Sequence, residues 1–205
     1  MHGWDYSAEI AGQFGNVSVG GMRLDHRALA ADAMAGHTWT NLFAKPRLGL
    51  GYTYASGDSN ANDDKNQTFD LLFGTNHRPY GMMDLWGLRN VHSPRLMSAI
   101  SPVRNLLLTA DYYLLWLADT HDFFFPDSGP GRSANGYGRN SQFKSFVGSE
   151  LDVVATYNVA RFGEIQLGYG HFFVGDYIEQ SLESIPANGG VVDADWFYVQ
   201  LKVTF

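Results

Sequence analysis

Strict alternation of apolar and polar side chains restricts this chain more than any other feature. In Trp196–Phe205 one parity holds Phe197, Val199, Leu201 and the two apolar residues at the end, and the other parity is mostly polar. A period of two residues is typical of a β-strand with one apolar and one polar face. The pattern recurs along the chain and predicts eight strands: Trp4–Phe14, Leu24–Trp39, Arg47–Ala55, Asn90–Ser101, Asn105–Leu117, Ser149–Val159, Glu164–Val174 and Trp196–Phe205.

Two of these segments carry a weaker signal than the rest. Leu24–Trp39 is rich in alanine, and propensity alone would allow a helix there. Asn90–Ser101 alternates less cleanly than its neighbours.

The connections between the predicted strands alternate in length. Thr40–Ala44, Pro102–Arg104 and Ala160–Gly163 are short, Ser56–Arg89, Thr120–Phe146 and Glu179–Val192 are long, and Gly15–Arg23 is intermediate. Outer-membrane barrels have tight turns on the periplasmic side and extended loops outside, whereas a soluble sandwich does not sort its loops in this way. We therefore predict an all-β, antiparallel transmembrane barrel in the bacterial outer membrane.

The composition agrees with a wall that faces lipid on one side and water on the other. Aromatic residues make up 15% of the chain, yet the mean hydropathy is −0.20. The best apolar stretch, Leu106–Ala118, is too short and too polar for a transmembrane helix. Lipid-facing aromatics fall at both ends of the predicted strands, as interfacial girdles require: Trp4, Tyr157 and Phe205 at the inner ends, and Tyr54, Trp116 and Phe173 at the outer ends. The alternative is an aromatic core inside a soluble β-protein.

Charge and cysteine content exclude several functions. The formal net charge is −7, which argues against nucleic acid as a partner, and the lack of cysteine excludes disulfides and thiolate metal sites. The start of the sequence already reads as a strand and lacks the pattern of an export signal. We therefore expect a mature, trimmed or partial sequence. The terminal Phe205, after an amphipathic strand, resembles the segment that outer-membrane proteins present to the barrel-assembly machinery.

One predicted connection and the strand before it carry a family resemblance. Lys45–Asp58 ends in a Gly-Asp pair, and Thr68–Asn90 follows it. These segments resemble the alginate-export family of outer-membrane porins at Gly57, Asp58, Thr68, Phe69, Asp70, His77, Tyr80, Gly81, Met82, Asp84 and Asn90. The resemblance implies a barrel of about sixteen to eighteen strands that passes an anionic polysaccharide such as alginate, or other small polar solutes.

The predicted strand number departs from that family. Eight strands alone would close into a barrel filled by its own side chains. We therefore expect residues 1–205 to form one domain that is the C-terminal part of a larger pore. The alternative is a complete, small barrel with a structural or adhesive role.

The predicted function is passive transport or export through a pore with no catalysis and no cofactor. Selectivity would come from pore width and from charges on the wall, with outer-membrane lipid and a polar or anionic solute as the partners. The charges assigned to the wall have mixed signs, so a general porin fits as well as an alginate exporter. The predicted pore-lining residues are Arg27, Arg47, Arg95, Asp111, Asp152, Glu164 and Lys202.

Three other groups of residues suggest further roles. Asp58, Asp63 and Asp64 lie in a loop dense enough in oxygen ligands for Ca²⁺, but the EF-hand order is missing and a solvated loop is favoured. An outer-membrane hydrolase is the third function considered, but His92 and Ser93 are neighbours in a strand and must point to opposite faces. Ser128–Gly138 reads as a mobile external loop, or as one that folds inward to constrict the pore.

Overall fold

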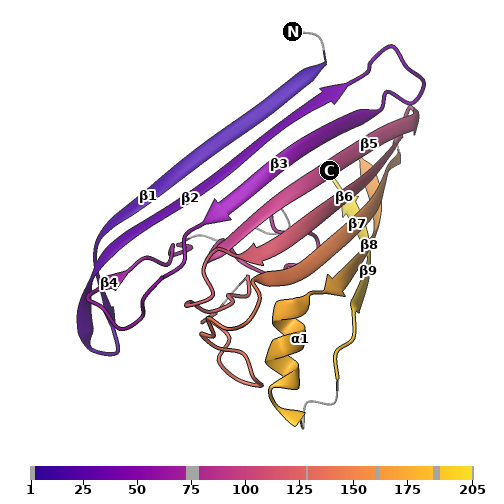
Figure 1. The fold of residues 1–205 in the computed structure, drawn as a ribbon. Helices are drawn as coiled ribbons and strands as arrows, with labels where there is room; N and C mark the ends of the chain where they lie inside the picture. The colour runs from indigo at the N-terminus through magenta and orange to yellow at the C-terminus, as the bar shows by residue number, and fades with distance from the viewer. Residues whose placement is uncertain (1–2, 73–78, 128, 160–161, 187–189, 205) are drawn as a thin grey trace.

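The computed structural model describes residues 3–72, 79–127, 129–159, 162–186 and 190–204, and these form one antiparallel sheet with a short helix. The long strands follow one another along the chain, and Figure 1 shows them side by side. They are β1 (Trp4–Val19), β2 (Met22–Thr38), β3 (Arg47–Ala55), β5 (Val91–Val103), β6 (Leu106–Leu117), β7 (Phe146–Val159), β8 (Gly163–Val174) and β9 (Ala194–Val203). The short β4 (Lys65–Asn66) pairs in parallel with β2, and α1 spans Asp176–Glu183.

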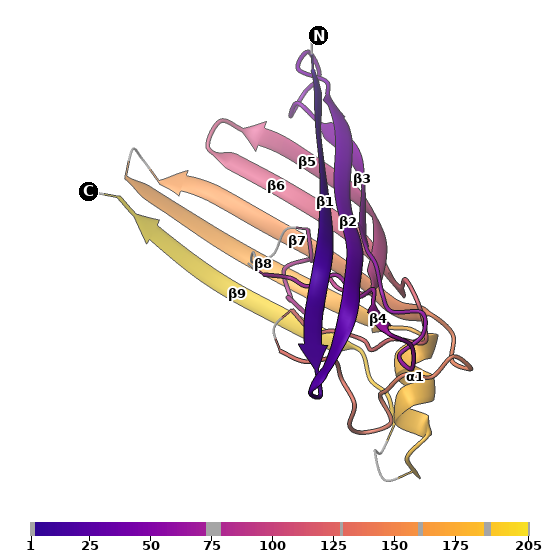
Figure 2. The ribbon, with the colours of Figure 1, turned by 90° about the vertical axis from the view of Figure 1, so that its left-hand side faces the viewer.

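The sheet is strongly curved and open. Its order is β1-β2-β3-β5-β6-β7-β8-β9, and β1 and β9 are its two outermost strands. Figure 2 shows these two strands on opposite sides of a trough, with loop segments lying between them. In the described residues the predicted all-antiparallel sheet is therefore confirmed, and closure into a barrel is not seen.

The first hairpin corrects the predicted intermediate loop at Gly15–Arg23. β1 runs on to Val19 and β2 begins at Met22, so only Gly20 and Gly21 form the turn. Both glycines have positive φ, at 58° and 83°, as a type I′ turn requires. The alanine-rich segment is a strand along its whole length, so the helical alternative for Leu24–Trp39 was wrong.

The helix α1 was not anticipated. It lies in the connection between β8 and β9, where an irregular loop was expected. No helix in the part of the chain that the structure describes is long and apolar enough to cross a membrane.

The two faces of the sheet differ as the alternation predicts. On β7, Glu150 and Asp152 are 0% and 3% exposed on the concave face, whereas Val153, the residue after Asp152, is 42% exposed on the convex face. Other large apolar side chains are also exposed on the convex face: Tyr6, Ile10, Leu48, Leu50, Leu96, Leu167, Phe197, Val199 and Leu201. Soluble monomers rarely expose so large a continuous apolar surface.

The hydrophobic core lies on the concave side, where the long connections fold against the sheet. Phe69, Tyr80 and Trp86 come from the connection between β3 and β5, and Phe124 comes from that between β6 and β7. The rings of Tyr80 and Trp86 meet edge to face at 5.3 Å. Through this core, the described parts of the connection between β3 and β5 pack against the concave face.

Asn90 joins the ends of two long connections. Its side-chain amide donates to the carbonyls of Asp119 (2.8 Å) and Phe123 (2.9 Å), and its Oδ1 accepts from the Asp119 amide (2.8 Å). Asn90 is fully buried and has φ of +47°, a conformation that asparagine tolerates better than most residues. Gly57 is needed beside it, because a Cβ there would lie 2.0 Å from Asn90 Oδ1.

Replacing Asn90 tests this junction. Asn90→Ala removes three hydrogen bonds and leaves buried backbone groups unsatisfied, so we expect a loss of about 2–4 kcal/mol in the stability of the loops. Limited proteolysis of the folded protein should show faster cleavage in residues 56–90 and 118–145. Asn62→Ala, at an exposed position of the same connection, should cleave at the wild-type rate. Equal rates in Asn90→Ala and wild type would contradict the junction.

Candidate functional site

The concave face carries two arginine–aspartate pairs, each built across a glycine. Arg95 on β5 passes over β3 at Gly51 and reaches Asp32 on β2, with Nη1–Oδ2 at 2.6 Å and Nη2–Oδ1 at 2.9 Å. A Cβ at Gly51 would lie 2.6 Å from Arg95 Nε, so only glycine leaves room for the guanidinium. Thr53 also accepts from Arg95 and donates to Asp32, both at 2.6 Å.

The second pair repeats this arrangement one strand closer to β1. Arg47 on β3 passes over β2 at Gly36 and holds Asp5 on β1, with Nε–Oδ2 at 2.9 Å and Nη2–Oδ1 at 2.5 Å. A Cβ at Gly36 would lie 2.3 Å from the guanidinium. Bidentate pairs of this kind hold both charges in a fixed geometry. Arg47 and Arg95 are therefore each neutralised by an aspartate, and each lies across a neighbouring strand of the sheet.

A group of acidic side chains on β6 and β7 holds the connection between β3 and β5, called the folded connection from here on. Asp111 and Asp152 are cross-strand partners in register, and Glu150 lies beside them on the concave face. Asp152 Oδ2 accepts the Met82 amide at 2.8 Å, and Glu150 Oε1 accepts the Met83 amide at 2.9 Å. The backbone amides of two neighbouring residues, Met82 and Met83, thus donate to two carboxyl groups that follow one another along the inward face of β7.

Gly81 permits that contact. Its φ is +87°, and a Cβ there would lie 2.3 Å from Glu150 Oε1. The contact with β7 is therefore made by residues 81–83 of the connection between β3 and β5. For Ser128–Gly138 an inward fold was one of two alternatives, and in the described part of that segment Arg132 lies over the rings of Phe124 and Tyr137.

Of the other predicted pore-lining residues, Glu164 and Lys202 lie on the inward parity of their strands and Arg27 does not. Glu164 and Lys202 are cross-strand partners on β8 and β9, on the parity of Tyr198 and Gln166. Arg27 lies on the wrong face for the predicted role. Its partner in register is Phe14, which is 89% exposed on the convex side, and its own side chain is 76% exposed and paired with Asp25 at 2.9 Å. Arg27 belongs to Leu24–Trp39, one of the two segments with weak alternation, so the sequence pattern did not define its face well.

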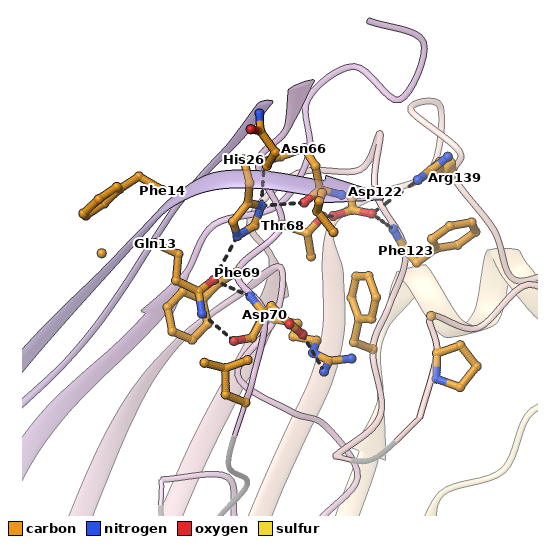
Figure 3. A pocket seen from close by; sticks show the side chains of 18 residues that line it. Gln13, Phe14, His26, Asn66, Thr68, Phe69, Asp70, Asp122, Phe123 and Arg139 are labelled. Carbon is orange, nitrogen blue, oxygen red and sulfur yellow. Dashed lines mark hydrogen bonds and ion pairs between the residues drawn. The ribbon is translucent and has the colours of Figure 1, made fainter. Parts of the chain in front are cut away.

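A cavity of about 710 Å³ lies at the end of the sheet where the long connections gather, between the first hairpin and two loops (Figure 3). Gln13 on β1 binds residue 70 twice, through Nε2 to the Asp70 carbonyl (2.6 Å) and through Oε1 from the Asp70 amide (2.8 Å). His26 on β2 lies 3.2 Å from the same Gln13 oxygen and 3.1 Å from Asn66. The cavity is lined by polar groups from both a strand pair and a loop.

Asp122 closes the other side of the cavity. Its carboxylate accepts from the Asp58 amide (2.9 Å), the Phe123 amide (2.7 Å) and the Thr68 hydroxyl, and Arg139 Nε lies 3.9 Å from Oδ1. Burial raises the pKa of the nearby Asp58 carboxyl; the Asn60 amide opposes this rise and the charge of Asp122 adds to it. Burial likewise raises the pKa of Tyr80 to about 12. Both groups are structural parts of the folded loops.

The Ca²⁺ candidate is not assembled. Asp58 is buried against Asp122, Asp63 Oδ1 accepts the Lys65 amide (2.8 Å), and the Asp64 carbonyl accepts the Asp25 amide (2.8 Å). Among the described residues, no three His, Cys, Asp or Glu side chains are grouped to hold a metal ion.

The residues proposed for a hydrolase are also separated. Ser93 is buried on the concave face, whereas the ring of its neighbour His92 stacks on Trp116 at 5.3 Å. His121 contacts Asp119 at 2.8 Å. The expected opposition of His92 and Ser93 is confirmed.

Sequence reasoning missed several of the residues that build the site. Asp5, Asp32 and Glu150 are not among the predicted pore-lining residues, and Asp32 lies in a segment of weak alternation. The available signal was glycine at an inward position beside an arginine, as at Gly36 and Gly51. A glycine inside a strand often marks close approach of another group.

Most of the motif residues that carried the family resemblance serve the folded connection. Phe69 and Tyr80 lie in its core, Gly81 and Met82 meet the acidic group, and Asn90 joins it to the next loop. His77 lies outside the described residues.

Comparison with known proteins agrees with this architecture. No curated protein matches the chain. The sequence model of the family described as alginate export matches residues 1–188. Because that match covers most of the 205 residues, this protein belongs to the alginate-export family.

Proposed function

We propose that this chain forms part of the wall of an outer-membrane channel for passive transport or export of small polar or anionic solutes. The observation that carries the proposal is the contrast between the two faces of one curved sheet: exposed apolar side chains on the convex side, and paired charges on the concave side. A membrane barrel needs that contrast, because lipid contacts one face and water the other. The family match supports the same role.

The proposal includes further strands that complete the barrel, about sixteen to eighteen in all. Among the described strands of the sheet path, β1 and β9 each have one neighbour, so each has a row of backbone amides and carbonyls with no described strand beside it. In hydrocarbon each such group costs several kcal/mol, which favours closure by additional strands. The small closed barrel is less well supported, since β1 and β9 lie on opposite sides of the trough in Figure 2.

In this channel the folded connection narrows the passage, and the balance between the paired arginines and aspartates sets the charge of the wall. Residues 80–83 lie against β7 and so occupy space within the trough. Recognition by the barrel-assembly machinery is proposed to use the last strand and Phe205, although Phe205 lies outside the described residues. Alginate is one candidate solute, and the proposal does not depend on it.

Breaking the Arg47–Asp5 pair from either side tests the charge of the wall. In planar bilayers under a salt gradient, Asp5→Asn leaves Arg47 uncompensated, and the reversal potential should shift toward anion preference. Arg47→Gln leaves Asp5 uncompensated and should shift it toward cation preference. Arg27→Gln makes the same chemical change on the convex face and should leave the potential unchanged. Equal shifts for Arg27→Gln and Arg47→Gln would reject the assignment of the two faces.

Gly81→Ala tests the constriction. The new Cβ meets Glu150 in a backbone conformation that disfavours alanine, which costs about 1–3 kcal/mol and should release residues 80–83 from β7. We expect a larger single-channel conductance. Gly138→Ala is the matched control, because a Cβ there meets nothing within 4 Å. An unchanged conductance in Gly81→Ala would show that this segment does not limit the passage.

A further inference from the structure

We infer that the cavity between the first hairpin and the long loops is a binding site for an uncharged saccharide unit. The inference rests on the proposed channel only in that such a solute would meet this cavity at the mouth of the pore. Its volume, about 710 Å³, falls within the range of about 300–1,000 Å³ that small-molecule sites have.

The polar lining suits hydroxyl groups. Gln13, Asn66 and Asp70 present planar amide and carboxylate groups, and Thr68 adds a hydroxyl. His26 lies between Gln13 and Asn66, and Gln13 binds the backbone of Asp70, as the dashed lines in Figure 3 show. The Thr68 hydroxyl donates to Asp122. The Asp70 side chain is 57% exposed and retains acceptor capacity beyond its contact with Arg89. A ring with adjacent hydroxyls can donate to such acceptors and accept from such donors at once.

The apolar lining suits the flat face of a sugar ring. In the run 123–125 the aromatic side chains alternate: Phe124 is buried against Tyr177, and Phe123 and Phe125 are half-buried and line the cavity. Phe69 lines it from the other loop. Aromatic faces carry negative charge density and attract the polarised C–H groups of a pyranose.

The charges of the cavity are balanced, which argues for an uncharged ligand. Arg89 Nη2 lies 3.1 Å from Asp70 Oδ1, and Arg139 Nε lies 3.9 Å from Asp122 Oδ1. Each guanidinium also lies over an aromatic ring, Arg89 at 5.8 Å from Phe125 and Arg139 at 4.4 Å from Phe123. A uronate would have to compete with Asp70 or Asp122 for its arginine. A neutral sugar leaves both pairs intact.

Titration calorimetry of the full protein in detergent tests the site, with maltotriose as the neutral probe and trigalacturonate as the anionic one. At pH 8, where histidine side chains are ordinarily neutral, wild type should bind maltotriose more tightly than trigalacturonate. Phe125→Ala should weaken maltotriose binding by about 3- to 10-fold. Phe125→Trp should retain binding, which excludes a simple folding defect. Phe43→Ala, at the opposite end of the sheet, should leave it unchanged.

Asp70→Asn tests the charge argument directly. It leaves Arg89 without its carboxylate, so the preference should move toward trigalacturonate. Tighter binding of trigalacturonate by wild type, or maltotriose affinity unchanged in Phe125→Ala, would overturn the inference. Absence of binding to both probes in a protein that conducts in bilayers would overturn the inference alone. A protein that binds maltotriose but does not conduct would uphold the site and reject the channel.

Discussion

The hydrogen-bonded ladder of antiparallel strands is the constraint on which the rest of this structure depends. It pairs the long strands in chain order from β1 to β9, and the register shifts in the described pairs lie near Ile100 and Leu115. A regular register keeps alternate side chains on fixed faces, because one slip would move every residue of a strand to the other side. The apolar convex face and the charged concave face both follow from that regularity.

Glycines at particular positions let the charged side chains of the concave face reach their partners. Gly36 and Gly51 let an arginine cross a strand and reach an aspartate on the next one. Gly81 lets a backbone segment approach Glu150. Charges removed from water are costly unless paired, and each of these glycines makes a pairing geometrically possible. The same device therefore serves both the charge balance of the wall and the position of the folded connection.

The strands were largely predictable from sequence, and the contacts between loops were not. Alternation located β6, β8 and β9 within about two residues, since a period of two depends only on which side of the sheet each residue faces. It failed for the first hairpin, where Gly15 and the polar residues after it suggested a loop. It also placed Arg27 on the wrong face. Ala28 and Ala30 of the same strand point inward, so Arg27, which has the opposite parity, must point outward.

The site could be predicted only in part, for a physical reason. Arg47, Arg95, Asp111 and Asp152 were assigned to the inward face from parity, and the structure places them there. Their partners were not found, because Asp5 and Asp32 lie far from the arginines in sequence and the contacts depend on the order of strands. The position of residues 80–83 against Glu150 depends on a long connection that folds back, and local pattern does not encode it.

In the proposed channel, alternate residues of one strand face lipid and water. Cysteine scanning tests this alternation cleanly, because the chain contains no cysteine. Single cysteines are placed at positions 150 to 155 of β7 and labelled with a fluorophore, and a lipid-soluble quencher is added to the reconstituted protein. We expect strong quenching at 151, 153 and 155 and weak quenching at 150, 152 and 154. Uniform quenching, or none at any position, would contradict it.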